Sequence, residues 1–70
     1  MREQIINHIK EHRTSQGITQ EQLAKVLGVS RQTIISIEKG HYIPSLSLAL
    51  KISQFFGCPT DEMFMRKENG

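Results

Sequence analysis

Apolar residues recur every three or four positions in five stretches of the chain, and a glycine separates each stretch from the next. This is the spacing of helices with one buried face, and glycine readily adopts the left-handed conformation that ends a helix. The predicted helices span residues of about 2–15, 19–27, 30–39, 45–56 and 59–65. The pattern therefore predicts an all-α fold, with residues 1–70 forming one compact domain of five helices.

The junction between the second and third predicted helices has a distinctive set of residues. Leu23 and Leu27 are spaced for burial, and the small side chain of Ala24 allows a second helix to cross closely. Gly28 permits a sharp turn, and the hydroxyl of Ser30 can cap the helix that follows. Two short helices joined by a tight glycine turn form a helix-turn-helix, so residues of about 19–40 are predicted to bind DNA.

The third predicted helix has a polar outer face that could read base pairs. If Ile34 and Ile37 point inward, the polar residues near the start of this helix lie outside. Arg can donate two hydrogen bonds to guanine in the major groove, and Gln can pair similarly with adenine. Ile35 could contact a thymine methyl group, although its exposure is equally explained by chance surface composition. The candidate base-reading residues are Arg31, Gln32, Thr33, Ile35 and Ser36.

Candidates for phosphate binding flank the helix-turn-helix. The start of the second helix offers free backbone N–H groups and a positive dipole end, which attract a phosphate. The residues just after the third helix are also within reach of the DNA backbone. Tyr42 has an alternative role as a cover for the core, with its hydroxyl in water. The candidate phosphate-binding residues are Thr19, Gln20, Ser30, Lys39, His41 and Tyr42.

Short sequence motifs along nearly the whole chain carry a family resemblance. They are GITQ (17–20), QLA (22–24), VSRQTI (29–34), IEKG (37–40), PSLSLALKI (44–52) and FFGCPTDEMF (55–64). With them the chain resembles the small Cro/Xre-type helix-turn-helix regulators, which include the lambdoid phage repressors. The resemblance implies a lambda-repressor-like, sequence-specific DNA-binding domain that regulates transcription, commonly as a repressor.

Three residue roles follow from that resemblance, while His12, Ile35 and Ile43 depart from the family pattern. It implies that Gln20 clamps the DNA backbone. It also implies a salt bridge between Arg13 and Glu38, which would join the first helix to the end of the third. His12 departs from the family pattern, because an aliphatic residue usually packs into the core at that position.

The fourth and fifth predicted helices carry more apolar surface than one small domain readily buries. The fourth shows two apolar stripes, one with Leu46, Ala49, Leu50 and Phe56 and the other with Leu48, Ile52 and Phe55. The last helix could cover the excess, but a homodimer through residues of about 52–66 is favoured, because a shared core stabilises a small domain. Two copies would place their third helices in major grooves about 34 Å apart, on a nearly palindromic site. The candidate interface residues are Ile52, Phe55, Met63, Phe64 and Met65.

Composition and charge narrow the class of protein only slightly. The formal net charge is +2, with six Lys or Arg against four Glu in residues 1–44. Such a small basic excess permits nucleic-acid binding without requiring it. The single cysteine, Cys58, cannot form an internal disulfide, which favours a cytoplasmic protein with a buried thiol. No apolar run is long enough for a membrane span, so no membrane partner is expected.

Other kinds of chemistry have weak support in this sequence. His8 and His12 are four positions apart, a spacing that can bind zinc, but no third ligand accompanies them. No nucleophile has a plausible base beside it, and no glycine-rich phosphate loop is present. We therefore expect no metal, no cofactor and no enzymatic activity. The alternative function is a protein-interaction module with the same fold, such as an antitoxin, whose partner the sequence does not identify.

Overall fold

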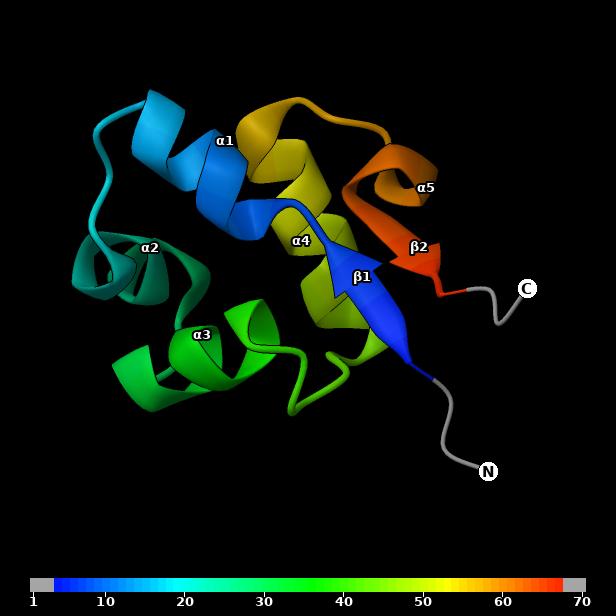
Figure 1. Cartoon of the computed structure of the whole chain (residues 1–70). Helices are drawn as coiled ribbons and strands as arrows, with labels where there is room; N and C mark the ends of the chain where they lie inside the picture. The colour runs from blue at the N-terminus through cyan, green and yellow to red at the C-terminus, as the bar shows by residue number, and fades with distance from the viewer. Residues whose placement is uncertain (1–3, 68–70) are drawn as a thin grey trace.

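The computed structural model describes residues 4–67, and helices make up most of this part of the chain (Figure 1). The fourth helix passes behind a short sheet, while the second and third helices pack against each other and lie below the first helix in this view (Figure 1). The helices are α1 (Ile9–Ser15), α2 (Gln20–Leu27), α3 (Arg31–Glu38), α4 (Leu46–Phe56) and α5 (Thr60–Met63). The strands are β1 (Ile5–Asn7) and β2 (Phe64–Arg66). The predicted five-helix fold is thus confirmed, with a small sheet added.

The sheet corrects the predicted limits of the first and last helices. β1 and β2 pair antiparallel, with Ile6 opposite Met65 and Asn7 opposite Phe64. A predicted helix start near residue 2 lies outside the described residues, but residues 5–7 are a strand and α1 begins only at Ile9. Each strand is too short to show an alternating pattern, and its hydrogen-bond partner comes from the other end of the chain. Sequence periodicity therefore gave no signal for either strand.

The turn between α2 and α3 has the predicted conformation. Gly28 has a left-handed backbone with φ of +73°, and the N–H of Val29 donates to the carbonyl of Ala24 at 3.0 Å. The hydroxyl of Ser30 accepts from the N–H of Thr33 at 3.1 Å, which caps α3. The glycine ends one helix and the serine starts the next, so the angle between α2 and α3 is fixed locally.

The core lies between α4 and the other helices, and its composition corrects the predicted stripes of α4. Ala49, Ile52 and Phe56 are buried, whereas Leu46 and Leu50 are 72% and 42% exposed. The inward face of α4 therefore combines members of both predicted stripes at a spacing of three and four residues, as in an ordinary amphipathic helix. The largest fully buried side chains are Ile9, Leu23, Ile34, Ile37, Ile52 and Met63.

Candidate nucleic-acid interface

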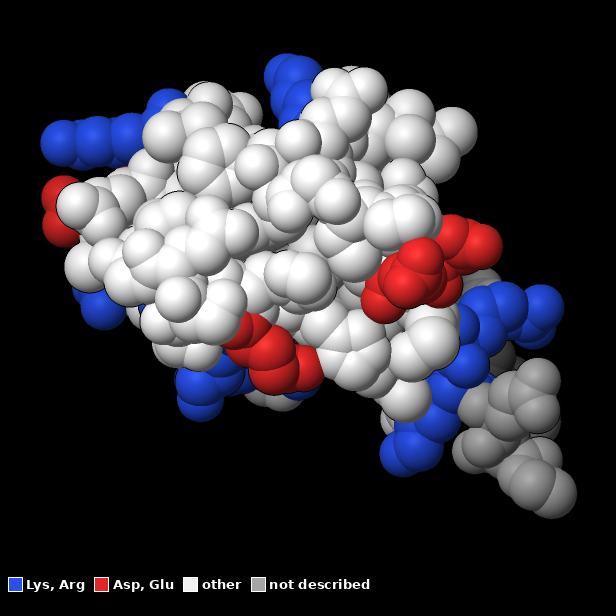
Figure 2. Space-filling view, turned by 90° about the horizontal axis from the view of Figure 1, so that it is seen from above, with Lys and Arg blue, Asp and Glu red and all other residues white. Residues whose placement is uncertain are grey.

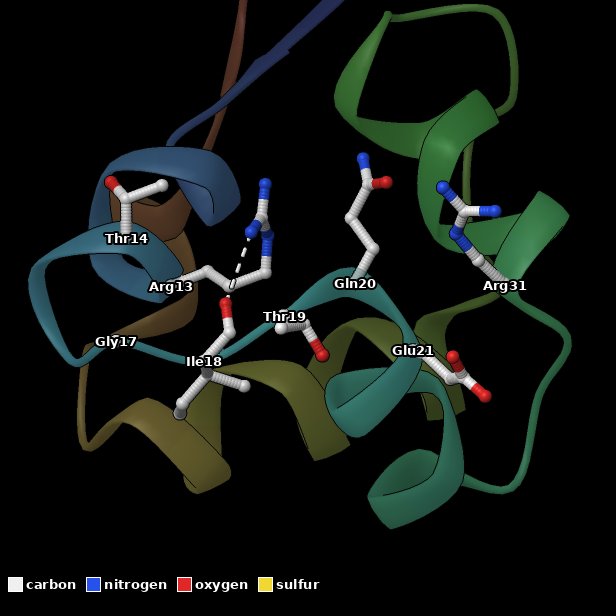
Figure 3. A pocket seen from close by; sticks show the side chains of 8 residues that line it. All are labelled: Arg13, Thr14, Gly17, Ile18, Thr19, Gln20, Glu21 and Arg31. Atoms are coloured by element: carbon white, nitrogen blue, oxygen red, sulfur yellow. Dashed lines mark hydrogen bonds between the residues drawn. The ribbon is translucent and has the colours of Figure 1, made fainter.

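A shallow hollow lies beside the starts of α2 and α3 (Figure 3). The side chains of Gln20 and Arg31 rise from the first residue of each helix and extend toward the same side of the molecule (Figure 3). The structure thus brings two predicted phosphate-binding residues, Thr19 and Gln20, and one predicted base-reading residue, Arg31, to the same hollow. The lining residues are Arg13, Thr14, Gly17, Ile18, Thr19, Gln20, Glu21 and Arg31.

The start of α2 is capped in a way that leaves donors available for an anion. The Thr19 hydroxyl accepts from the N–H of Gln22 at 3.0 Å, and the N–H of Thr19 donates to the Gln22 side chain at 2.8 Å. This capping box provides an acceptor for the N–H of Gln22, the third residue of the helix. The N–H groups of Gln20 and Glu21 have no intrahelical acceptor. Such N–H groups, together with the helix dipole, suit a phosphate oxygen.

The five candidate base-reading residues lie on the part of α3 that is left outside the core, whereas Ile34 and Ile37 are buried. Arg31 and Gln32 are exposed, and the other three are half-buried. The Gln32 amide donates to the Ser36 hydroxyl at 3.3 Å, so the two side chains lie one turn apart on the same face. A second, smaller hollow adjoins this face, lined by Gln32, Thr33, Ser36, His41 and Tyr42. The outer part of α3 is therefore mostly polar, with Ile35 as the one apolar member of the candidate set, and a hollow adjoins it.

The segment after α3 places its predicted phosphate-binding residues at the surface. Lys39, His41 and Tyr42 are all exposed, and the N–H of His41 donates to the Ser36 carbonyl at 2.9 Å. Tyr42 is 47% exposed and lines the hollow beside α3. Its side chain therefore lies at the edge of the candidate interface, and this exposure is compatible with both of its predicted roles.

A buried ion pair holds the end of α3 against the rest of the helices. Arg13 and Glu38 contact each other through Nε and Oε2 at 2.7 Å and through Nη2 and Oε1 at 3.1 Å. The Arg13 guanidinium also donates to the Ile18 carbonyl at 3.0 Å, and the Gln20 amide donates to Glu38 at 3.1 Å. The pair implied by the family resemblance is present, and it joins α1, α2 and α3. The positive charge of Arg13 also compensates the negative charge of Glu38, so that this carboxylate repels a nearby phosphate less strongly.

One further polar contact reaches the end of α3, and nothing in the sequence pattern predicts it. The Asn7 side chain donates from Nδ2 to the carbonyl of Ile37 at 2.8 Å. The sequence pattern assigns Asn7 to a helix, and nothing near it in the chain indicates a partner thirty residues away. Only the pairing of β1 with β2 brings Asn7 to this position.

The candidate dimer residues fall into two groups in the structure. Ile52 and Met63 are completely buried in the core of one chain, so neither presents surface to a second copy. Phe64 packs against the same core. Phe55 and Met65 are 38% and 43% exposed and remain accessible. Of the predicted interface residues, Ile52 and Met63 instead belong to the core of one chain, because they lie on the inward face of α4 and at the end of α5.

The two histidines considered as a metal pair have other partners. The His8 ring contacts the Glu11 carboxylate at 2.6 Å, and this hydrogen bond lowers the pKa of Glu11. The His12 ring packs on Phe56, with their centroids 5.6 Å apart, which explains how it replaces an aliphatic residue. Across residues 4–67, no three potential ligands gather around a metal position. None of the helices in this range is long and apolar enough to cross a membrane.

Comparisons with known proteins agree with this geometry. A helix-turn-helix family model matches residues 9–63. An uncharacterized HTH-type transcriptional regulator of Methanocaldococcus jannaschii is 54% identical over 63 residues, covering 90% of this chain and 96% of that protein. The phage CTXphi transcriptional repressor RstR of Vibrio cholerae is 32% identical, covering 86% of this chain and 54% of RstR.

A solved structure shows that the similarity extends to the fold over most of the chain. The restriction-modification controller protein C.AhdI of Aeromonas hydrophila superposes with a TM-score of 0.71 and 31% identity. The match covers 79% of this chain and 83% of C.AhdI. The chain therefore belongs to the Cro/C1-type helix-turn-helix family of DNA-binding transcriptional regulators.

Proposed function

We propose that this protein recognises a specific DNA sequence by placing the start of α3 in the major groove. The observation that carries the proposal is the common direction of Gln20 and Arg31 from the starts of two adjacent helices (Figure 3). In this arrangement, a phosphate seated at the start of α2 orients the protein while Arg31 reaches base edges. Capping by Ser30 keeps the start of α3 ordered for that contact.

Charge distribution supports this choice of face. The face seen in Figure 2 lies on the side away from α3 in Figure 1, and its charged side chains are mainly near the edges. A neutral face of this kind gives little attraction for phosphates, which dominate the affinity of proteins for DNA. The groove side of α3 instead carries Arg31, with Lys39 just beyond the helix. We assign base reading to Arg31, Gln32, Thr33, Ile35 and Ser36, and phosphate contacts to Thr19, Gln20, Ser30, Lys39, His41 and Tyr42.

Two substitutions separate base reading from phosphate binding. Arg31→Ala is expected to remove about 1–3 kcal/mol of discrimination at one base pair. Gln20→Ala is expected to weaken binding to all duplexes by a similar factor, because a backbone contact carries no direct sequence information. Fluorescence anisotropy with a selected duplex and its single-base variants measures both effects. An Arg31→Ala protein that keeps the full preference at every position would rule out the assigned reading role.

The proposal includes a homodimer that binds a nearly palindromic site. Its support is the exposed apolar surface of the terminal sheet, where Ile6 and Met65 lie opposite each other and are 41% and 43% exposed. Phe55, at the end of α4, adds a further exposed ring. Paired copies would bury these side chains and present two α3 helices to successive grooves.

A charged residue at the sheet should separate the two copies. Met65→Asp is expected to weaken self-association at least tenfold, on the order of 1.4 kcal/mol or more, because a carboxylate would enter an apolar interface. The matched control is Val26→Asp, which places the same charge at a 60% exposed position on α2. Sedimentation equilibrium over a range of concentrations measures the association. A wild-type protein that stays monomeric, or equal effects of the two variants, would contradict this interface.

We assign the regulator a repressing role, in which the bound dimer covers promoter DNA. The support is the similarity to RstR, whose name describes a transcriptional repressor. A reporter gene preceded by the selected operator tests the direction of regulation. Expression should fall when the protein is supplied, and a rise would show that it activates.

A further inference from the structure

Asn7 contacts the ends of two helices at once. Its Oδ1 accepts from the N–H of Ile9 at 3.3 Å, in the first turn of α1. Its Nδ2 donates to the carbonyl of Ile37 at 2.8 Å, in the last turn of α3. His8 occupies the cap position of α1 but makes no side-chain cap bond, so Asn7 supplies the acceptor there. A single amide therefore bridges the start of α1 and the end of α3.

The Ile37 carbonyl is shielded from water and has two donors. Ile37 is 1% exposed, and its carbonyl also accepts from the N–H of Gly40 at 3.0 Å. The last carbonyls of a helix have no intrahelical donor, and a buried carbonyl that loses a donor pays for its desolvation. The Asn7 contact thus stabilises the last turn of α3 in one particular arrangement.

Asn7 is itself held in place by the terminal sheet. It lies in β1 opposite Phe64 of β2, and the N–H of the next residue, His8, donates to the Met63 carbonyl at 3.0 Å. The sheet therefore fixes the amide relative to the core through both ends of the chain. The Arg13–Glu38 pair holds the end of α3 from the side of α1, and Asn7 adds a second attachment from the sheet.

We propose that Asn7 is a positioning residue for α3, the helix with the candidate base-reading residues. It anchors α3 to the terminal sheet through the Ile37 carbonyl. The expected effect of Asn7 on DNA specificity rests on the proposed function. Its expected effect on the end of α3 in the free protein does not. A helix attached at its far end by Arg13 and Asn7 has a fixed tilt, so Arg31 meets the bases from a defined direction. Binding groups must be held within a fraction of an ångström to discriminate well between ligands.

Only a side chain with both an acceptor and a donor can make this bridge. Asn7→Asp keeps the acceptor for Ile9 and places a negative charge near the start of α1, where it is favourable. It loses the donor and sets a carboxylate oxygen against the Ile37 carbonyl. Asn7→Ser also keeps an acceptor close to Ile9 but is too short to reach Ile37, and it introduces no charge. The two variants thus remove the same contact by different means, and the second serves if the first does not fold.

Amide hydrogen exchange in the free protein tests the attachment. In both variants the N–H groups of Lys39, Gly40 and His41, at the end of α3, should exchange at least about threefold faster than in the wild type. The reference is the N–H of Cys58, which donates to Ser53 at the end of α4 and should change only with global stability. Ser45→Ala, which removes the cap of α4, is the matched control and should not affect the end of α3 selectively. Equal changes at Cys58 and Gly40 in the Asn7 variants would overturn the attachment.

Specificity for DNA tests the positioning role. The ratio of affinities for a selected duplex and a random duplex should fall about three- to tenfold in the Asn7 variants and stay unchanged in Ser45→Ala. A faster exchange with an unchanged ratio would overturn positioning and leave Asn7 a purely structural residue. A wild-type protein that selects no duplex would instead overturn the proposed function, and the exchange result would then decide the attachment alone.

Discussion

Replacing Glu38 with alanine is expected to lower the free energy of unfolding by about 3–5 kcal/mol. The side chains of Arg13 and Glu38 are only 10% and 5% exposed, so the substitution leaves a buried guanidinium without its carboxylate. The Gln20 amide loses the same acceptor. A chain of 70 residues has a total stability of roughly 4–10 kcal/mol, so this one substitution removes a third or more of it over most of that range.

Urea denaturation followed by circular dichroism measures the loss. Glu21→Ala is the matched control, because Glu21 is exposed in the first turn of α2 and its removal should change stability by less than about 0.5 kcal/mol. If Glu38→Ala and Glu21→Ala unfolded at the same urea concentration, the ion pair would not hold the end of α3 as described.

Ile34→Ala is expected to destabilise the protein by about 2–5 kcal/mol, because it leaves a cavity at a fully buried position. Its neighbour Ile35 provides a control in the same helix with the same chemical change. Ile35 is only half-buried on the outer side of α3, so Ile35→Ala should cost clearly less stability. It should also alter DNA binding if the side chain contacts a thymine methyl group.

Urea denaturation of the two variants, run side by side, separates the two faces of α3. Greater destabilisation by Ile35→Ala than by Ile34→Ala would mean that the helix is rotated about its axis relative to the structure. The base-reading assignments would then be wrong as well, because Arg31 and Gln32 would no longer face outward.

The sequence predicted best where the determinants are local. Gly28 and Ser30 act through the backbone of their own turn, so composition and spacing were enough to locate the junction between α2 and α3. The capping box that the structure shows at Thr19 and Gln22 is of the same local kind, because it joins residues three positions apart. The Arg13–Glu38 contact spans 25 positions and came only from the family resemblance.

The sequence predicted poorly where the partner lies far along the chain. Residues 5–7 have isoleucines at positions that also fit a helix, and only pairing with residues 64–66 makes them a strand. The inward face of α4 depends on which apolar residues meet the core, and its high apolar content made several faces equally plausible. Asn7 is the clearest example, since its role depends on the strand that periodicity did not predict.

The central claim is that the start of α3 reads a specific DNA sequence. Its most direct test is selection of bound duplexes from a random pool at about 150 mM salt, where binding through phosphates alone is suppressed. We expect enrichment of a nearly palindromic motif whose half-sites are about one helical turn apart. A pool that stays random after repeated selection would contradict it and would shift attention to a protein partner.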